Sequence, residues 1–352
     1  MGCECQSTKN NAFQQKQTLM NNEQKKQNQY VPKDNNINEK IDIKKEKEII
    51  SNNKQFVITN FELKNYLECH NDNIIYLIEL YNKKIMTCSY DKTSKIWDLN
   101  NLKCEKVIQN DDIVMCLLEF VPDMVLFGLQ SGVIELIDLK NPEGKKIYFK
   151  GHLLYVNCLV KCNDKFFASA SNDTYIRIWD YYKGECVNIL SGHNQNIFCL
   201  IKLDEDKLCS AGADKEIKIW NWKMNKCEET LTGHKSWIKS LYKLKNGNII
   251  SGSDDGIIKI WENNIEIKEL IGHQDSIKSI CGISDNYIAS ASFDKTIKIW
   301  DLNTGNCVQT LDGHSDKVNC ILYHSDGYLI SCSSDKTIKI WIKTKIVNIN
   351  TT

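Results

Sequence analysis

The stretch SASFDKTIKIWD, residues 290–301, recurs in closely similar form at two other places in the chain. Residues 169–180 read SASNDTYIRIWD, and residues 331–341 read SCSSDKTIKIW. Each copy has a short apolar run, a polar turn, and a second run that ends in tryptophan. In the second run apolar and charged residues alternate, which is the period of a half-buried β-strand. The stretch therefore predicts paired strands, and its recurrence predicts a repeat architecture.

The tryptophans give the period of the repeat. Six of the eight are regularly spaced, at Trp97, Trp179, Trp220, Trp261, Trp300 and Trp341. Successive separations are 82, 41, 41, 39 and 41 residues, and the double gap has room for one further unit. In that gap Ile137 occupies the position of the tryptophan. We therefore predict seven units across residues 61–350.

Three further positions recur at fixed distances before the tryptophan. Twenty-seven residues before it stand His70, His152, His193, His234, His273 and His314, mostly preceded by glycine. Ten residues before it stand Thr87, Ser169, Ser210, Ser251, Ser290 and Ser331. Six residues before it stand Asp91, Asp173, Asp214, Asp255, Asp294 and Asp335. Four coincident positions in six units exclude a chance repetition.

On these residues the chain resembles the WD-repeat family of β-propellers, the family of the G-protein β subunit, over about five-sixths of its length. The resemblance implies an all-β fold, a seven-bladed propeller of four-stranded antiparallel blades around a central channel. It also implies a hydrogen-bonded chain in each blade, in which aspartate orients histidine, histidine contacts the hydroxyl and the hydroxyl contacts the indole. Buried polar groups need such partners. Because this set recurs in six units, we interpret Ser169, His152 and Asp173 as structural and not as a hydrolase triad.

The second unit departs from this pattern. Asn110 replaces the histidine, Phe127 the hydroxyl, Ser131 the aspartate and Ile137 the tryptophan. We predict a blade that is held by apolar packing. Sequence drift is favoured over a specialised binding edge, because cores tolerate apolar exchanges.

A closed ring also needs a strand that joins its ends, since open sheet edges are a liability. Residues 61–70, FELKNYLECH, are similar to CVQTLDGH at 307–314, a segment that forms an outer strand in the family. We therefore expect residues 61–70 to complete the seventh blade. Residues 346–349 are the competing candidate.

The composition limits the classes of function. Lys and Arg number 45 and so do Asp and Glu, so the neutral chain is not expected to bind nucleic acid. No run approaches the apolar length of a membrane span, and no secretory signal is visible. We expect a cytoplasmic protein.

Eight of the 16 cysteines fall at two repeating offsets, Cys104, Cys186, Cys227 and Cys307 in one set and Cys116, Cys158, Cys199 and Cys320 in another. Equivalent positions lie in different sheets, too far apart for disulfides. We predict small buried hydrophobic residues in a reducing cytosol. No ligand spacing typical of zinc occurs, and no metal or other cofactor is expected.

The first 55 residues differ from the rest. They are rich in Asn, Gln and Lys, which predicts a disordered arm before a propeller at 56–352. The start, MGCECQS, resembles an N-myristoylation signal with Gly2 as the acceptor, and Cys3 and Cys5 are candidates for S-palmitoylation. Two acyl chains would tether the protein stably to a membrane. Gln6 stands where the signal usually has Ser or Thr, so an ordinary N-terminus with two reactive thiols is the alternative.

Partner-binding residues are predicted from the family pattern, which places three sets on the face beside the Gly-His turns. They are Tyr155, Asn196, Trp237, Ser276 and Lys317; Asn157, Phe198, Lys239, Lys278 and Asn319; and Tyr90, Asn172, Asp254, Phe293 and Ser334. Exposed aromatic residues suit the anchor role of binding hot spots. Loop packing is the alternative role for these aromatic residues. Trp222, by contrast, is predicted to lie in the core.

The function predicted is that of a non-catalytic scaffold or adaptor that binds proteins or peptides, with no small-molecule substrate. The alternative is a peptide reader, such as the substrate-recognition subunit of a ubiquitin ligase. A phosphopeptide reader would favour arginine forks, but the single arginine, Arg177, lies inside a strand run. An enzyme is the third hypothesis, and no unique nucleophile–base pair or phosphate loop supports it.

Overall fold

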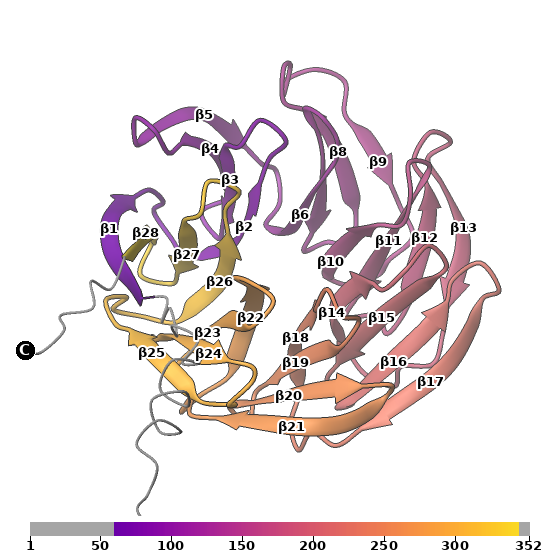
Figure 1. The fold of residues 1–352 in the computed structure, drawn as a ribbon. Helices are drawn as coiled ribbons and strands as arrows, with labels where there is room; N and C mark the ends of the chain where they lie inside the picture. The colour runs from indigo at the N-terminus through magenta and orange to yellow at the C-terminus, as the bar shows by residue number, and fades with distance from the viewer. Residues whose placement is uncertain (1–59, 345–352) are drawn as a thin grey trace, which may run out of the picture. The chain divides into compact units, whose positions relative to one another are not determined.

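The computed structural model describes residues 60–344, in which every regular element is a β-strand. Twenty-eight strands form seven four-stranded antiparallel sheets, arranged as blades around a common centre (Figure 1). The predicted all-β, seven-bladed propeller is confirmed. The predicted arm at 1–55, the lipidation candidates Gly2, Cys3 and Cys5, and residues 346–349 lie outside the described residues.

The blades follow the chain in order. Blade 1 contains β2 (Ile74–Glu79), β3 (Ile85–Ser89), β4 (Thr93–Asp98) and β5 (Lys103–Gln109). Blade 2 contains β6 (Val114–Val121), β7 (Met124–Leu129), β8 (Ile134–Asp138) and β9 (Ile147–Phe149). Blade 3 contains β10 (Val156–Lys161), β11 (Phe166–Ser171), β12 (Ile176–Asp180) and β13 (Glu185–Leu190). Blade 4 contains β14 (Ile197–Lys202), β15 (Lys207–Gly212), β16 (Glu216–Asn221) and β17 (Lys226–Thr232).

The remaining three blades repeat this arrangement. Blade 5 contains β18 (Ile238–Lys243), β19 (Ile249–Ser253), β20 (Ile257–Glu262) and β21 (Ile265–Ile271). Blade 6 contains β22 (Ile277–Gly282), β23 (Tyr287–Ser292), β24 (Ile297–Asp301) and β25 (Cys307–Leu311). Blade 7 contains β26 (Val318–Tyr323), β27 (Leu329–Ser333), β28 (Thr337–Thr344) and β1 (Asn60–Glu68). The innermost strands, β2, β6, β10, β14, β18, β22 and β26, face the centre (Figure 1).

The ring is closed by β1, as predicted from residues 61–70. This strand pairs with β28 in an antiparallel register that sets Phe61 opposite Lys343 and Leu63 opposite Trp341. A bulge follows Leu63, and the outer strands of blades 3, 4, 5 and 6 are bulged at the same place beside their own tryptophans. Phe61 is fully buried, in a core cluster with residues of blade 6 and blade 7. The N-terminal strand therefore takes the place that an outer strand has in every other blade.

The polar chain predicted for each blade is present with good geometry. In blade 3, His152 Nδ1 lies 2.8 Å from Asp173 Oδ2, and its Nε2 lies 2.7 Å from Ser169 Oγ. Trp179 donates its indole N–H to Ser169 Oγ over 2.8 Å. The same three contacts are complete in blades 1, 4, 6 and 7. These recurring residues satisfy one another in the blade core and are structural.

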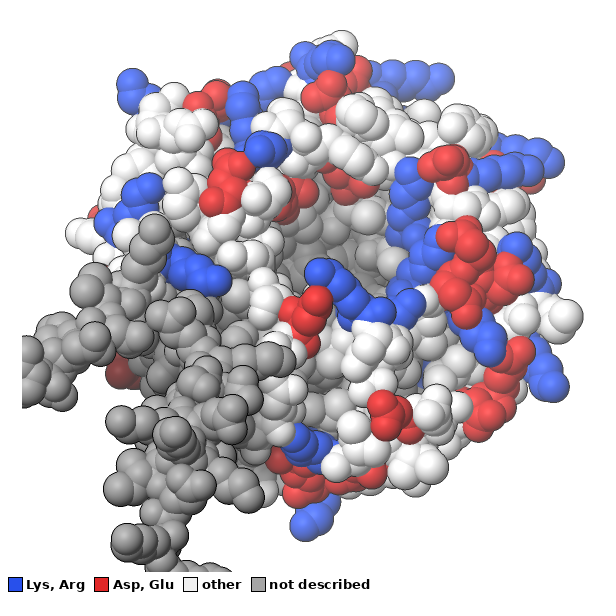
Figure 2. Space-filling model, viewed as in Figure 1, with Lys and Arg blue, Asp and Glu red and all other residues white. Residues whose placement is uncertain are grey.

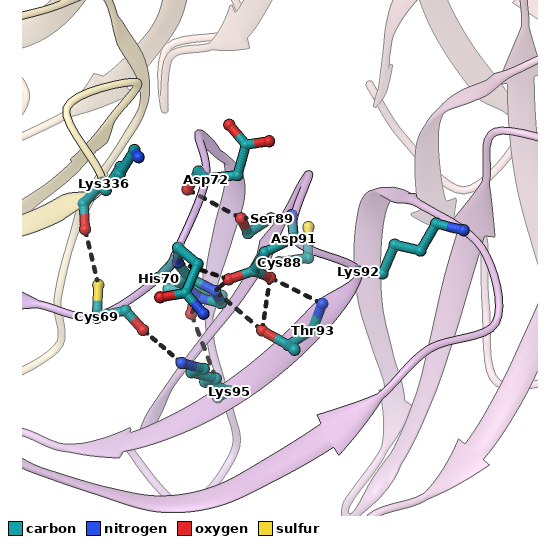
Figure 3. A network of polar contacts seen from close by, with 12 residues as sticks. Cys69, His70, Asp72, Cys88, Ser89, Asp91, Lys92, Thr93, Lys95 and Lys336 are labelled. Carbon is teal, nitrogen blue, oxygen red and sulfur yellow. Dashed lines mark hydrogen bonds and ion pairs between the residues drawn. The ribbon is translucent and has the colours of Figure 1, made fainter.

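Blade 1 shows how the aspartate is held in place. Asp91 contacts His70 Nδ1 with one carboxylate oxygen and accepts the Thr93 hydroxyl with the other, at 2.7 Å (Figure 3). Burial raises the pKa of Asp91, but these hydrogen bonds and the Asn71 N–H outweigh it, so the net pKa falls to about 2. The carboxylate therefore stays ionised and fixes the histidine tautomer.

Blade 5 is the exception, and it corrects the expectation of six equal chains. His234 Nδ1 lies 3.7 Å from Asp255, beyond hydrogen-bond distance, although Nε2 still contacts Ser251 Oγ at 2.7 Å. Within residues 60–344, His234 Nδ1 is one of three buried side-chain polar atoms with no partner. Burial lowers the pKa of His234 to about 4, and Asp255 offsets this only partly.

Apolar packing holds blade 2, as predicted. Phe127 and Ile137 are fully buried, in a cluster with Met86 and Ile96 of blade 1. Asn110, which stands where other units have histidine, is also buried and donates its side-chain N–H to Ser94 Oγ over 2.9 Å. Neighbouring blades therefore cover one another's apolar sides even where the polar chain is missing.

The cysteines divide into two groups, and for one group the prediction is wrong. Cys116, Cys199 and Cys320 on inner strands are buried, and Cys158 is half-buried. Cys104 and Cys307 are exposed, and Cys186 and Cys227 are only half-buried. These four lie at the outer-strand bulge opposite the tryptophan, where the sheet ends and no further strand covers them. All fourteen cysteines in the described range are free thiols.

Candidate functional site

A cavity of about 460 Å³ lies at the centre of the propeller, between the inner strands. The second residue of each inner strand contributes to its lining: Ile75, Met115, Asn157, Phe198, Lys239, Lys278 and Asn319. We call these seven residues the channel layer. Figure 2 shows the hollow at the centre of the ring, with charged side chains at its edge. One side chain from each blade therefore meets in one place, although the residues are about 40 positions apart in the chain.

Five of the predicted partner-binding residues belong to this layer. They are Asn157, Phe198, Lys239, Lys278 and Asn319. Sequence reasoning missed Ile75 and Met115, although they stand at the same distance after His70 and Asn110. That offset was the signal that could have found them. The channel layer is consequently uneven, with apolar side chains in blades 1 and 2 and lysines in blades 5 and 6.

An aromatic–lysine cluster stands at the edge of the cavity. The rings of Phe198 and Trp237 lie 5.8 Å apart, and Trp237 is 46% exposed. Lys239 Nζ lies 3.4 Å from the Phe198 ring centroid and 4.6 Å from that of Trp237. Cation–π attraction at such distances stabilises the ammonium group over the rings. Residues of blades 4 and 5 thus make one surface that combines exposed aromatic area with positive charge.

Asp254 connects this cluster to blade 6. Its carboxylate lies 3.8 Å from Lys239 Nζ and accepts the hydroxyl of Ser276. Burial lowers the pKa of Lys239 to about 8; Asp254 opposes this shift and Lys278 adds to it. Burial also lowers the pKa of Lys278. Both lysines are therefore partly removed from solvent, and the charge of Lys278 disfavours the protonated form of Lys239.

The amides of the channel layer are used inside the protein. Asn157 donates to Asn172 Oδ1 of its own blade and to the Ile197 carbonyl of blade 4, both over 2.7 Å. Asn319 donates to Ser334 Oγ over 3.0 Å and to the Ile74 carbonyl of blade 1 over 2.8 Å. The bonds to the Ile197 and Ile74 carbonyls join neighbouring blades. They also hold the layer rigid, which suits a binding surface.

The other predicted residues lie around the same face. Tyr90 is 41% exposed, whereas Tyr155 is half-buried and accepts Gln130 Nε2–H at 2.6 Å. Phe293 is half-buried beneath Lys317, whose Nζ lies 4.8 Å from the ring centroid. Trp222 is buried and donates to the Glu205 carbonyl, as predicted for a core residue. Tyr90 and Trp237 are therefore the aromatic residues of this face that are most open to solvent.

Arg177 lies on β12, with its guanidinium 3.8 Å from Cys186 Sγ, and does not line the central cavity. Among residues 60–344, no group of three His, Cys, Asp or Glu side chains is placed to hold a metal ion. In the same range no helix has the length and apolarity needed to cross a bilayer.

Comparison with known proteins agrees with the repeat. The family described as "WD domain, G-beta repeat" matches residues 144–180, 184–221, 225–262, 264–301 and 305–341. WD repeat-containing protein 1 of Gallus gallus is 32% identical over 112 residues, which are 30% of this chain and 18% of that protein. The match thus spans less than a fifth of that relative. The crystal structure of the WD40 beta propeller domain of Doa1 superposes with a TM-score of 0.71 at 23% identity, over 80% of this chain and 97% of that domain.

Proposed function

This chain belongs to the WD40-repeat family, whose propellers generally serve as protein-interaction scaffolds, and on that premise we propose that its cavity face binds a segment of a partner protein without catalysis. The observation that carries the proposal is the aromatic–lysine cluster at the cavity edge. A half-exposed tryptophan that packs on a second aromatic ring beside a cavity has the character of a binding hot spot. Rigid blades around it limit the entropy lost when a partner docks.

The test is capture of partners by the double variant Trp237→Ala/Phe198→Ala. Affinity purification of the tagged full chain, followed by mass spectrometry, should recover partners with the wild type and lose them with the double variant. Alanine at a hot spot costs about 2 kcal/mol or more, a thirtyfold or greater loss of affinity. The control is Tyr182→Ala, which removes a 71% exposed aromatic side chain from the turn between β12 and β13. Retention of every partner by the double variant would show that another surface binds them.

The same experiment separates the scaffold from its alternative. A substrate-recognition subunit of a ubiquitin ligase should co-purify ligase subunits through one surface and a substrate through the cavity face. The double variant should then lose the substrate and keep the ligase. Arg177 lies in a blade sheet and not at the cavity, so a phosphate-reading arginine fork is not part of this proposal.

We further propose that the protein is cytoplasmic and tethered to a membrane face by acyl chains on Gly2, Cys3 and Cys5. The proposal is supported by the start of the sequence, MGCECQS, and by the stability that two acyl chains give to anchoring. Intact-mass analysis of the N-terminal peptide from native protein should show the added myristoyl mass, and Gly2→Ala should lose it and move the protein to the soluble fraction. An unmodified Gly2 would contradict the tether.

A further inference from the structure

The channel layer carries two positive charges on neighbouring blades. Lys239 is the second residue of β18 and Lys278 the second residue of β22. No carboxylate belongs to the layer, and the other members are apolar, aromatic or amide side chains. The amide groups of Asn157 and Asn319 already donate to protein acceptors. The two ammonium groups are therefore the positive charges that a ligand entering this side of the cavity meets, with the Asp254 carboxylate beside one of them. Glu79, which also lines the cavity, is the last residue of β2 and lies four residues beyond the layer.

Only part of this charge is neutralised within the protein. Asp254 lies 3.8 Å from Lys239 Nζ and also accepts the Ser276 hydroxyl. Lys278 has no ion-pair partner within 4.0 Å in the span from residue 60 to residue 344. A lysine that lines a cavity without a counter-ion costs free energy through desolvation, and an incoming anion offsets that cost.

The aromatic rings beside the cavity do not favour a cationic ligand. Lys239 Nζ already occupies the position over Phe198, 3.4 Å from the ring centroid, and lies 4.6 Å from that of Trp237. A lysine or arginine from a partner would meet a like charge at the place where cation–π attraction would otherwise hold it. The same arrangement leaves the rings free to contact apolar parts of a segment whose acidic group reaches the lysines.

We infer that the central cavity receives an acidic side chain of the bound segment, whose anionic oxygens lie between Lys239 and Lys278 while neighbouring residues of the segment pack on Trp237. This inference rests on the proposed function of the cavity face and adds the chemistry of the partner. The cavity of about 460 Å³ falls within the range of ligand pockets and has room for one such side chain with water. Charge-assisted hydrogen bonds to both ammonium groups supply the specificity.

Peptide selection tests the inference. Short acetylated and amidated peptides, degenerate except for one central residue fixed as Glu, Gln, phosphoserine or Lys, are bound to the immobilised full chain. The wild type should retain the fixed-Glu pool about tenfold or more over the fixed-Gln pool, and the fixed-Lys pool least. Lys278→Met should abolish the preference for Glu over Gln. Lys278→Arg should keep it, and so should Lys183→Met, which removes an exposed lysine from the turn between β12 and β13.

A second measurement locates the bound peptide. Trp237 is exposed, whereas the other seven of the eight tryptophans are buried, so acrylamide quenching reports mainly on Trp237. Bound fixed-Glu peptide should protect Trp237 from quenching in the wild type and not in Lys278→Met, with circular dichroism showing that the variant is folded. If the wild type retained the phosphoserine pool more strongly than the Glu pool, the anionic group between the two lysines would be the phosphate of a phosphorylated segment.

Two results overturn the inference. Equal retention of the Glu and Gln pools by the wild type, or retention of neither, shows that the cavity does not select an acid. Selection of the Lys pool shows that the rings bind a cation after all. Partner capture with Trp237→Ala/Phe198→Ala decides the proposed function separately. If the face captures partners but does not discriminate between the Glu and Gln pools, the proposed scaffold function holds and only the inference of an acidic ligand is wrong.

Discussion

Replacing Trp179 by alanine is expected to lower the free energy of unfolding by about 3–5 kcal/mol, because it empties the centre of an aromatic cluster. The Trp179 ring is 1% exposed and packs on Phe149 and Phe167, with centroids 5.9 and 6.2 Å away. The change also leaves Ser169 without the indole donor that it accepts at 2.8 Å. Equilibrium unfolding in urea, monitored by circular dichroism, gives the measurement.

The matched control is the same substitution at Trp237. This ring is half-exposed and contacts Phe198 and Lys239 at the cavity edge, so Trp237→Ala should change the free energy of unfolding by no more than about 1 kcal/mol. Equal losses at the two positions would contradict the assignment of Trp179 to the blade core and Trp237 to a binding surface. Together with partner capture, the pair separates a tryptophan that holds the fold from one that is available to a ligand.

Acid is expected to destabilise the propeller through His234 by about 3 kcal/mol between pH 7 and pH 4. Burial lowers the pKa of this histidine in the folded protein to about 4, against 6.5 for the free side chain. In the intervening range the unfolded chain binds the proton and the folded chain does not. The free energy of unfolding is therefore not reduced by His234 above pH 6.5, and it falls as the pH drops from 6.5 toward 4.

The comparison that isolates this effect is His234→Gln, which cannot titrate. Its free energy of unfolding should fall less between pH 7 and pH 4 than that of the wild type, whatever its value at pH 7. Asp91, with a folded pKa of about 2, contributes stability above its ordinary pKa that is lost at still lower pH, so its effect adds below this window. If the free energies of unfolding of wild type and variant fell in parallel as the pH was lowered, His234 would have the same pKa in the folded and unfolded chains, which contradicts the prediction.

Much of the architecture could be predicted from the sequence, because each blade is a local unit. The spacing of tryptophan, aspartate, hydroxyl and histidine is set within one stretch of about 30 residues, and the same spacing produces the same hydrogen bonds in five blades. Closure by β1 was also predictable, since residues 61–70 repeat the outer-strand pattern that precedes the Gly-His pairs of the other units. A short apolar run predicted the strand before each turn aspartate, and alternation of apolar and charged residues predicted the strand after it.

Other features depend on how the blades meet, and here prediction from a single unit failed. Cys104 and Cys307 share their offset with other cysteines, but their burial is decided by whether another strand covers the bulge. His234 and Asp255 have the same spacing as the other pairs, yet they lie 3.7 Å apart. Nearby, Glu266 and Glu269 pair with Lys259 and supply a local charge arrangement that is specific to blade 5. The spacing of histidine and aspartate in the sequence does not predict that difference.

By itself, then, the sequence determined the number of blades, the polar chain within them and the strand that closes the ring, because hydrogen bonding and apolar alternation act over short stretches of chain. The tertiary structure alone decided that the side chains of the channel layer line one cavity and that the Lys239 ammonium lies over the rings of Phe198 and Trp237. The contact between Lys239 and Phe198 joins adjacent blades, 41 positions apart in the chain, and its geometry is set by the packing of one sheet on the next.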